Sequence, residues 1–121
     1  MAASIGSLLI GSSNVDQMKD WYRAAFGAKE NEMGAFELGP VQLFIEAHSD
    51  VSGPTKEPAR VIINLDVDDV RGLESHLETQ GVRWVRRVEQ EPFGLIGTLA
   101  DPDGNYVQII QWGATPEAHK A

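Results

Sequence analysis

The sequence predicts an α+β protein built from two successive βαβββ modules. The order strand, helix and three strands occurs twice along the 121 residues. The predicted helix caps Asn14 and Asp68 lie 54 residues apart, and the glycines that close the two helices, Gly27 and Gly81, lie 54 residues apart as well. A constant offset between matching helix boundaries is expected of an internal duplication. We prefer duplication to the alternative that two helices of similar length share such residues by chance.

The first module is predicted within residues 4–50. Residues 5–10 are β-branched, apolar and too few for a helix, so they predict a strand. Asn14 is a suitable N-cap for a helix that ends at Gly27, and its apolar positions are Val15, Met18, Tyr22, Ala25 and Phe26. Three strands are expected at residues 29–33, 35–38 and 41–48. The Gly- and Pro-containing residues 49–58 predict a linker.

The second module is predicted within residues 58–113. A strand is expected at residues 60–67, and Asp68 or Asp69 caps a helix that ends at Gly81. Strands follow at residues 82–88, 95–100 and 106–112, and the tail 113–121 is expected to be frayed. The stretch Asp-Pro-Asp-Gly at 101–104 predicts a tight turn. The stretch does not match an EF-hand calcium loop, because its glycine is not at the sixth position and no glutamate follows at the twelfth.

Length and composition limit the possible functions. A chain of 121 residues with 42% apolar and 23% charged residues is expected to form a single soluble domain, 1–121. The formal charge of −8 argues against nucleic acid or an anionic membrane as partner and permits a cationic small ligand. The absence of cysteine excludes disulfides and thiol nucleophiles. No apolar run is long enough for a membrane helix, so a cytoplasmic location is expected.

Three features together resemble the vicinal oxygen chelate superfamily, which includes glyoxalases, bleomycin resistance proteins and extradiol dioxygenases. They are the doubled βαβββ order, the WYRAAFG end of the first helix, and the DPDGN turn before the final VQIIQ strand. The resemblance extends from about Ile5 to Trp112. It implies that the two modules curl into a cup-shaped mixed sheet with the helices packed outside. It also implies a homodimer, because a second copy commonly completes the cup in chains this short.

The resemblance also marks the positions where family enzymes hold a divalent metal. These positions are Ser7 and Ile62 in the first strand of each module and Gln108 in the last strand. In the fourth strand Glu46 is the best match, although Phe44 shares its face. A catalytic metal generally requires three or more side-chain donors, which this set does not supply. We therefore expect neither a metal nor another cofactor, and the open question is a residual site at Glu46, His48 or Gln108.

Strand alternation predicts which side chains line the cup if the family geometry holds. The predicted ligand-binding residues combine aromatic, apolar and polar side chains, and they are Ser7, Phe44, Glu46, Ile62, Asn64, Tyr106, Gln108 and Trp112. Such a mixture is typical of small-molecule sites, and aromatic rings beside carboxylates suit a planar or cationic ligand. The equal alternative is that these rings fill space at a dimer interface.

Other catalytic motifs are not found. The sequence has no G-x-S-x-G motif for a hydrolase triad and no phosphate-binding loop. The basic residues Arg83, Arg86 and Arg87 are interpreted as solvated side chains that protect a strand edge, and the alternative is an anion contact.

The leading hypothesis is a metal-independent protein that binds a small organic molecule, similar to the bleomycin-resistance branch. Whether the chain is an enzyme is left open. One alternative is a divalent-metal-dependent lyase or dioxygenase of the same fold. Another is a metal-free enzyme with Glu46 as general base. The third is a structural dimer without a ligand.

Overall fold

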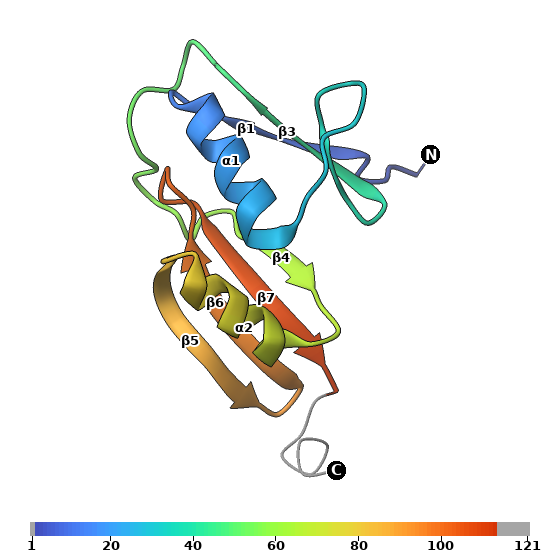
Figure 1. Ribbon diagram of the computed structural model, residues 1–121. Helices are drawn as coiled ribbons and strands as arrows, with labels where there is room; N and C mark the ends of the chain where they lie inside the picture. Colours follow the sequence, from blue (N-terminus) through green and yellow to red (C-terminus); the bar gives the residue numbers. More distant parts are fainter. Residues whose placement is uncertain (1, 114–121) are drawn as a thin grey trace. The chain divides into compact units, whose positions relative to one another are not determined.

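The computed structural model describes residues 2–113 of the chain, and it is an α+β structure as predicted (Figure 1). The chain divides into two compact units, Met1–Gly53 and Pro54–Ala121, which we call unit 1 and unit 2. The boundary falls within the predicted linker, residues 49–58. Each unit contains one helix and one open mixed sheet. Neither described helix is long and apolar enough to cross a membrane.

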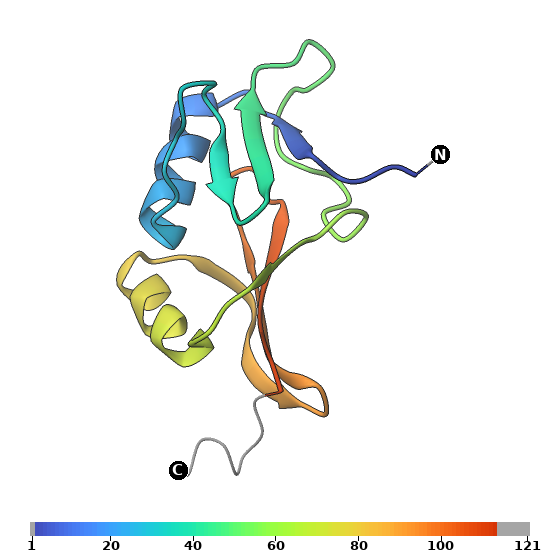
Figure 2. The ribbon, with the colours of Figure 1, turned by 90° about the vertical axis from the view of Figure 1, so that its right-hand side faces the viewer.

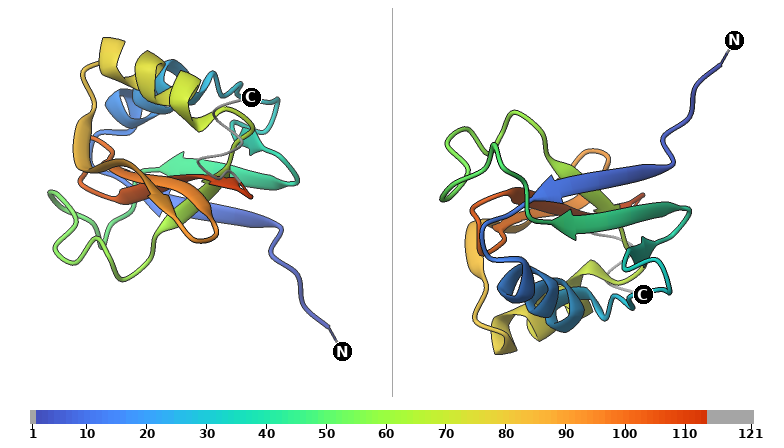
Figure 3. Two further views of the ribbon diagram at one scale, coloured as in Figure 1. Left: turned by 90° about the horizontal axis from the view of Figure 1, so that it is seen from below. Right: turned by 90° about the horizontal axis from the view of Figure 1, so that it is seen from above.

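Unit 1 contains a three-stranded sheet in the order β1-β3-β2. Its elements are β1 (Ser7–Gly11), α1 (Val15–Phe26), β2 (Phe36–Leu38) and β3 (Val41–Glu46). Strand β1 runs parallel to β3, and β2 runs antiparallel to it. Helix α1 lies on one face of this sheet (Figure 3). The core of the unit is made of buried apolar side chains from the helix and the sheet, among them Met18, Tyr22, Ala25, Phe36, Leu43 and Ile45.

Unit 2 contains a four-stranded sheet in the order β4-β7-β6-β5. Its elements are β4 (Ile63–Asp66), α2 (Val70–Thr79), β5 (Arg83–Glu91), β6 (Gly94–Ala100) and β7 (Tyr106–Trp112). Strand β4 runs parallel to β7, whereas β6 is antiparallel to both of its neighbours. Helix α2 packs against β5 and β7 on one face (Figure 2). The core of the unit is made of buried apolar side chains from the helix and the sheet, among them Leu77, Leu95, Leu99, Val107 and Ile109.

The two units share one backbone register, counted from the helix N-caps Asn14 and Asp69. In unit 1 the residue two before the cap, Ser12, donates its backbone N–H to the carbonyl of Glu46 at 2.9 Å. In unit 2 the residue two before the cap, Val67, donates its N–H to the carbonyl of Ile110 at 2.8 Å. The parallel pairs β1–β3 and β4–β7 can therefore be compared position by position.

The strand predicted at residues 29–33 is wrong. This segment is a turn in which only Glu30 pairs with Phe36 through a single bridge. The side-chain oxygen of Asn31 accepts the backbone N–H groups of Met33 and Ala35 at 3.0 and 3.1 Å. Because asparagine satisfies these amides locally, the segment does not need a neighbouring strand. Unit 1 consequently has one strand fewer than the predicted βαβββ module.

Of the two predicted N-cap candidates for α2, Asp69 is the cap, and its carboxylate accepts the N–H of Gly72 at 3.0 Å. The N-caps are therefore 55 residues apart. At the other ends, Gly27 is the C-cap of α1, whereas Gln80 is the C-cap of α2 and Gly81, at φ +67, follows it. Asn14 occupies the cap of α1 but makes no side-chain cap hydrogen bond. Instead, the hydroxyl of Ser12 accepts the Asn14 N–H at 2.9 Å.

The predicted tight turn at residues 101–104 is confirmed. Gly104 has φ +86 and donates its N–H to the carbonyl of Asp101 at 2.9 Å. The buried carboxylate of Asp101 accepts the backbone N–H groups of Asp103 and Asn105. This aspartate therefore serves the turn itself by binding backbone amides.

Candidate functional site

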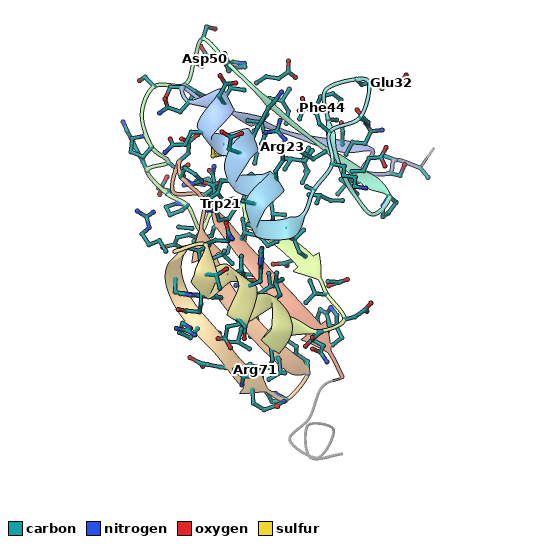
Figure 4. The ribbon with its side chains drawn as sticks, in the orientation of Figure 1. Trp21, Arg23, Glu32, Phe44, Asp50 and Arg71 are labelled. Atoms are coloured by element: carbon teal, nitrogen blue, oxygen red, sulfur yellow. The ribbon has the colours of Figure 1, made fainter. Side chains whose placement is uncertain are left out.

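The face of each sheet that lies opposite its helix carries most of the predicted ligand-binding residues, and we call it the open face of that unit. In unit 1, Leu43 and Ile45 are buried on the helix side, so the alternating side chains belong to the open face. The parallel register pairs Ser7 with Gln42, Leu9 with Phe44, and Gly11 with Glu46. Phe44 is half-buried and labelled in Figure 4, whereas Ser7 and Glu46 are exposed.

In unit 2 the register brings Asn64 directly opposite Gln108 on the open face. The next strand adds Thr98 opposite Gln108, and the amide of Gln108 donates to the Thr98 hydroxyl at 3.2 Å. Tyr106 and Trp112 occupy alternate positions of β7 on the same face. Ile62 precedes β4 by one residue and is in line with Tyr106 by extension of the register. The five residues predicted in unit 2 therefore share one face.

Strand β5 extends this face through two irregularities in its pairing with β6. Trp84 pairs with Leu99 but Arg86 pairs with Thr98, so one extra residue of β5 is inserted between them. A second shift occurs between Arg86 and Glu89. An extra residue reverses the direction of the following side chains, and bulges often direct side chains in this way. Arg86 consequently lies on the open face, in one row with Thr98, Gln108 and Asn64.

The arginine cluster predicted from the sequence is divided between the two faces. The Arg86 guanidinium donates to Glu89 at 3.0 Å and also to Glu91, and these bonds raise the pKa of Arg86. Arg87 forms ion pairs with Glu74 and Glu78 of α2 on the helix side. Both guanidinium groups are thus paired with carboxylates, so two of the three arginines are engaged within the protein, which weakens the interpretation of the cluster as an anion contact.

One end of the open face of unit 2 carries an aromatic cluster. The indole N–H of Trp112 donates to a carboxylate oxygen of Asp66 at 2.8 Å. The rings of Phe93 and Trp112 lie 5.1 Å apart between centroids and are tilted by 46°. Sequence reasoning missed Phe93, because a residue in a hairpin turn belongs to no periodic pattern. The available signal was an aromatic residue between Pro92 and Gly94, where turn-forming polar residues are usual.

A hollow of about 320 Å³ lies beside Tyr106, lined also by Glu57, Pro58, Ala59 and Arg60. The linker is held here because Thr55 donates its backbone N–H to the Asp103 carbonyl at 2.8 Å. Arg60 is paired with Glu57 at 3.0 Å. The hollow therefore places one predicted ligand-binding residue, Tyr106, next to the end of the predicted linker and the first residue of the strand predicted at 60–67.

The shared register changes which residue of unit 1 corresponds to Gln108. Gln108 pairs with the residue five before the cap of its helix, and Phe44 does the same in unit 1. Phe44 is therefore the counterpart of Gln108. Glu46 lies two residues further along β3, opposite Gly11, where unit 2 has Ile110 opposite Asp66. The physical reason is that local sequence does not fix the register of a parallel strand pair.

His48 also differs from its predicted placement. Strand β3 ends at Glu46, so His48 lies in the loop rather than on the strand face. Its Nδ1 accepts the backbone N–H of Asp50 at 3.1 Å, and Asp50 is labelled at the tip of this loop in Figure 4. Within residues 2–113 no three His, Asp or Glu side chains are grouped closely enough to hold a metal ion.

The donor set at the family positions therefore does not fit a divalent metal. It consists of the serine hydroxyl of Ser7, the rings and alkyl groups of Phe44 and Ile62, and the neutral amide of Gln108. Divalent ions in proteins are bound mainly by carboxylates, imidazoles and thiolates.

Comparisons with known proteins agree with this fold. A family model described as the Glyoxalase/Bleomycin resistance protein/Dioxygenase superfamily matches residues 4–109. TnmS3, an antibiotic binding protein from Streptomyces sp. CB03234, is 18% identical, with a TM-score of 0.69 over 93% of this chain and 98% of that chain. The lactoylglutathione lyase from Agrobacterium tumefaciens is 17% identical, with a TM-score of 0.68 over the same shares.

A third solved structure is a glyoxalase/bleomycin resistance protein/dioxygenase family enzyme from Burkholderia phytofirmans PsJN. It is 20% identical, with a TM-score of 0.74 over 91% of this chain and 99% of that chain. The comparison with curated proteins found no match. The three structural likenesses show a common fold, and the family model covers most of the sequence. The chain therefore belongs to the glyoxalase, bleomycin resistance protein and dioxygenase superfamily.

Proposed function

We propose that this protein is a metal-independent member of its superfamily that binds and sequesters a small organic molecule, aromatic or cationic, without altering it. One observation carries the proposal. Ser7, Ile62 and Gln108 are at metal positions that the family resemblance implies, and Phe44 has the register of Gln108. These four residues offer only one hydroxyl and one neutral amide. A chain that keeps the fold but lacks these donors is better suited to binding than to metal-assisted catalysis.

The chemistry of the open faces supports binding. Amide and hydroxyl groups of Asn64, Gln108 and Thr98 form a row that can donate and accept hydrogen bonds. The aromatic side chains of Tyr106 and Trp112 belong to the same face of unit 2. Small-molecule sites commonly combine an apolar lining with a few polar groups that orient the ligand. TnmS3, which has the same fold, is described as an antibiotic binding protein.

We also propose a cytoplasmic homodimer in which each chain derives from a duplicated module. The shared register of the two units supports the duplication. Exposed apolar side chains on or near the sheet of unit 1, such as Leu9 at 57% exposure, support contact with a second copy. Analytical ultracentrifugation at several concentrations tests this part of the proposal separately from ligand binding.

The function is tested by metal analysis and calorimetry on the same preparation. Protein purified without chelator is expected to contain no stoichiometric divalent metal. Titration with a panel of cationic and aromatic natural products is expected to give binding that EDTA does not change, and mass spectrometry is expected to recover the ligand intact. A stoichiometric metal that is lost in Gln108→Ala or Glu46→Ala would refute the proposal, and so would conversion of the ligand.

A matched pair of variants locates the binding. Gln108→Leu removes the amide in the centre of the open face of unit 2 and is expected to weaken the ligand found in the panel about tenfold. Gln17→Leu makes the same chemical change on the exposed surface of α1 and is expected to have no effect. Equal affinities for the two variants would contradict a site on this face.

The second candidate is an enzyme of the same fold, and the observation that favours it is the similar likeness to the lactoylglutathione lyase structure. If the protein is a lyase or dioxygenase, its turnover is expected to depend on added divalent metal. The metal analysis above distinguishes this candidate from sequestration.

A further inference from the structure

We propose that Asp66, Phe93 and Trp112 form a subsite for a flat aromatic ring that carries a positive charge. The inference rests on the proposed function and narrows it to one ligand class and one end of the open face of unit 2. Trp112 is the last residue of β7, and Phe93 lies in the turn between β5 and β6. Asp66, which supplies the negative charge, is the last residue of β4.

The aromatic part of the subsite is exposed to an unusual degree. Trp112 is 59% exposed and Phe93 is 40% exposed, although their rings contact each other at 5.1 Å. Rings buried in a core stabilise the fold, whereas a pair left in contact with water gives the fold little of that stabilisation. The pair therefore offers a free apolar surface of the kind on which a planar ring stacks.

The Trp112 ring is nevertheless held in place. Its indole N–H donates to Asp66 at 2.8 Å, across the β4–β7 pair. A hydrogen bond to an ionised acceptor is stronger than one between neutral groups. Because the indole is already oriented, a ligand that stacks on it loses less side-chain freedom on binding.

The register partner of Trp112 on the neighbouring strand is a glycine, so that position has no side chain. Gly94 pairs with Trp112 in the register, and it has φ +150. A Cβ at this position would lie 2.2 Å from the backbone carbonyl oxygen of Gln111, so no other residue fits. Ring stacking needs such an unobstructed approach.

Charge at this end of the face selects for cations. Asp66 is exposed and borders the indole directly. Glu91 pairs with Gly94, the partner of Trp112, and Glu89 pairs with Ile96 in the next row. Arg86 neutralises part of this charge, which leaves three carboxylates against one guanidinium. A cation above an aromatic face is attracted by the ring and, here, also by the neighbouring carboxylates.

The test uses two probes of one shape, N-methylacridinium and acridine, at a mildly alkaline pH where acridine is neutral. Calorimetry of the wild-type protein is expected to show about tenfold tighter binding of the cation. Asp66→Asn keeps a side-chain oxygen that can accept the indole N–H but removes the charge. It is expected to reduce that preference to less than about threefold. Trp112→Leu is expected to weaken both probes about tenfold, because it removes the stacking surface.

Asp50→Asn is the matched control, because it removes a carboxylate from an exposed loop of unit 1. It is expected to leave both affinities unchanged. Equal affinities of the two probes for the wild-type protein would overturn the subsite, and so would an unchanged preference in Asp66→Asn. Substitutions that change dimer dissociation but not probe binding would also overturn it, because a second copy would then be the occupant.

The two proposals fail separately. If neither N-methylacridinium nor acridine binds but a compound of the natural-product panel does, the subsite is refuted while sequestration stands. If the probes bind at this subsite but the panel ligands are converted by a metal-dependent reaction, sequestration is refuted while the subsite stands.

Discussion

The carboxylate of Glu74 in α2 accepts the backbone N–H of Val88 in β5 at 3.1 Å. The same carboxylate accepts hydrogen bonds from Arg71 at 3.1 Å and Arg87 at 3.3 Å. Glu74 is buried, and Val88 lies within the second register shift of the edge strand, between Arg86 and Glu89. A bulged strand leaves backbone amides without a partner in the sheet, and Glu74 satisfies one of them.

The Glu74 contact predicts an acid-dependent loss of stability. Burial alone raises the pKa of this carboxyl, but hydrogen bonds from Arg71, the Val88 amide and Arg87 outweigh burial and lower the pKa below its ordinary value. A carboxyl with a lowered pKa contributes stability that is present above its unfolded pKa and is lost as pH falls through its folded pKa. The unfolding free energy is thus expected to fall below about pH 4.5. In Glu74→Gln the unfolding free energy is expected to fall less steeply over this acidic pH range, because the variant has no carboxyl at this position.

The free-energy cost of removing Glu74 is measured near neutral pH by urea denaturation. Glu74→Ala leaves the Val88 N–H without its partner and is expected to cost about 2 kcal/mol. Glu57→Ala removes an exposed carboxylate that also faces an arginine and is expected to cost less than about 0.5 kcal/mol. Similar costs for the two variants would mean that the contact of Glu74 with the Val88 N–H adds no measurable stability.

The two helix N-termini are expected to respond differently to cap substitutions. Asp69→Ala removes an acceptor for the Gly72 N–H and is expected to destabilise the protein by about 1 kcal/mol. Asn14→Ala is expected to cost only a few tenths of a kcal/mol, because the Asn14 side chain makes no cap bond. Ser12→Ala removes the oxygen that serves α1 and is expected to cost about 1 kcal/mol. Thermal unfolding is expected to show that Asn14→Ala is the least destabilising of the three variants. Equal costs for Asn14→Ala and Asp69→Ala would contradict this expectation.

Substitution of Gly94 is expected to be more destabilising than substitution of another glycine at positive φ. Gly94→Ala places a Cβ against the carbonyl of Gln111 and is expected to cost about 3 kcal/mol or more. Gly39 has φ +63 with open space around it, so Gly39→Ala meets only the backbone strain of about 1–2 kcal/mol. Chemical denaturation compares the two variants. A Gly39→Ala cost as large as that of Gly94→Ala would show that the close approach is relieved.

The local stability of the loop after α1 is expected to depend on the Glu30 side chain. Hydrogen bonds from Lys19 and Arg23, each at 2.8 Å, lower the pKa of the Glu30 carboxyl. Arg23 is labelled on α1 in Figure 4. In Glu30→Gln the amides of residues 28–35 are expected to exchange faster with solvent, measured by hydrogen exchange. Asp20→Asn removes another partner of Arg23 but keeps Glu30, so it is expected to leave that exchange unchanged.

Several elements could be predicted because their signals are local. Helix α1 is placed correctly because its apolar residues repeat with helical spacing and Gly27 adopts the left-handed conformation that ends it. Strand β7 has the predicted bounds, 106–112, because a tight turn precedes it and its residues alternate. The turn at residues 29–33 could not be recognised, because the amides that Asn31 satisfies become apparent only when the chain is folded.

The candidate site could be predicted in part. Asn64, Tyr106, Gln108 and Trp112 share one face, as alternation along a strand requires. Phe93 and Arg86 could not be assigned to this face. Phe93 lies in a turn, and the direction of Arg86 depends on a register shift that arises from pairing with β6.

The sequence by itself determined the fold class, the helix positions and the poor donor chemistry of Ser7, Ile62 and Gln108, because residue types and short-range periodicity suffice for these. Only the tertiary structure decided that Phe44 rather than Glu46 corresponds to Gln108, and that Asp66 orients Trp112 beside Phe93. Both depend on strands that are distant in the chain. Their register is set by backbone pairing and core packing, and no short sequence window contains both partners.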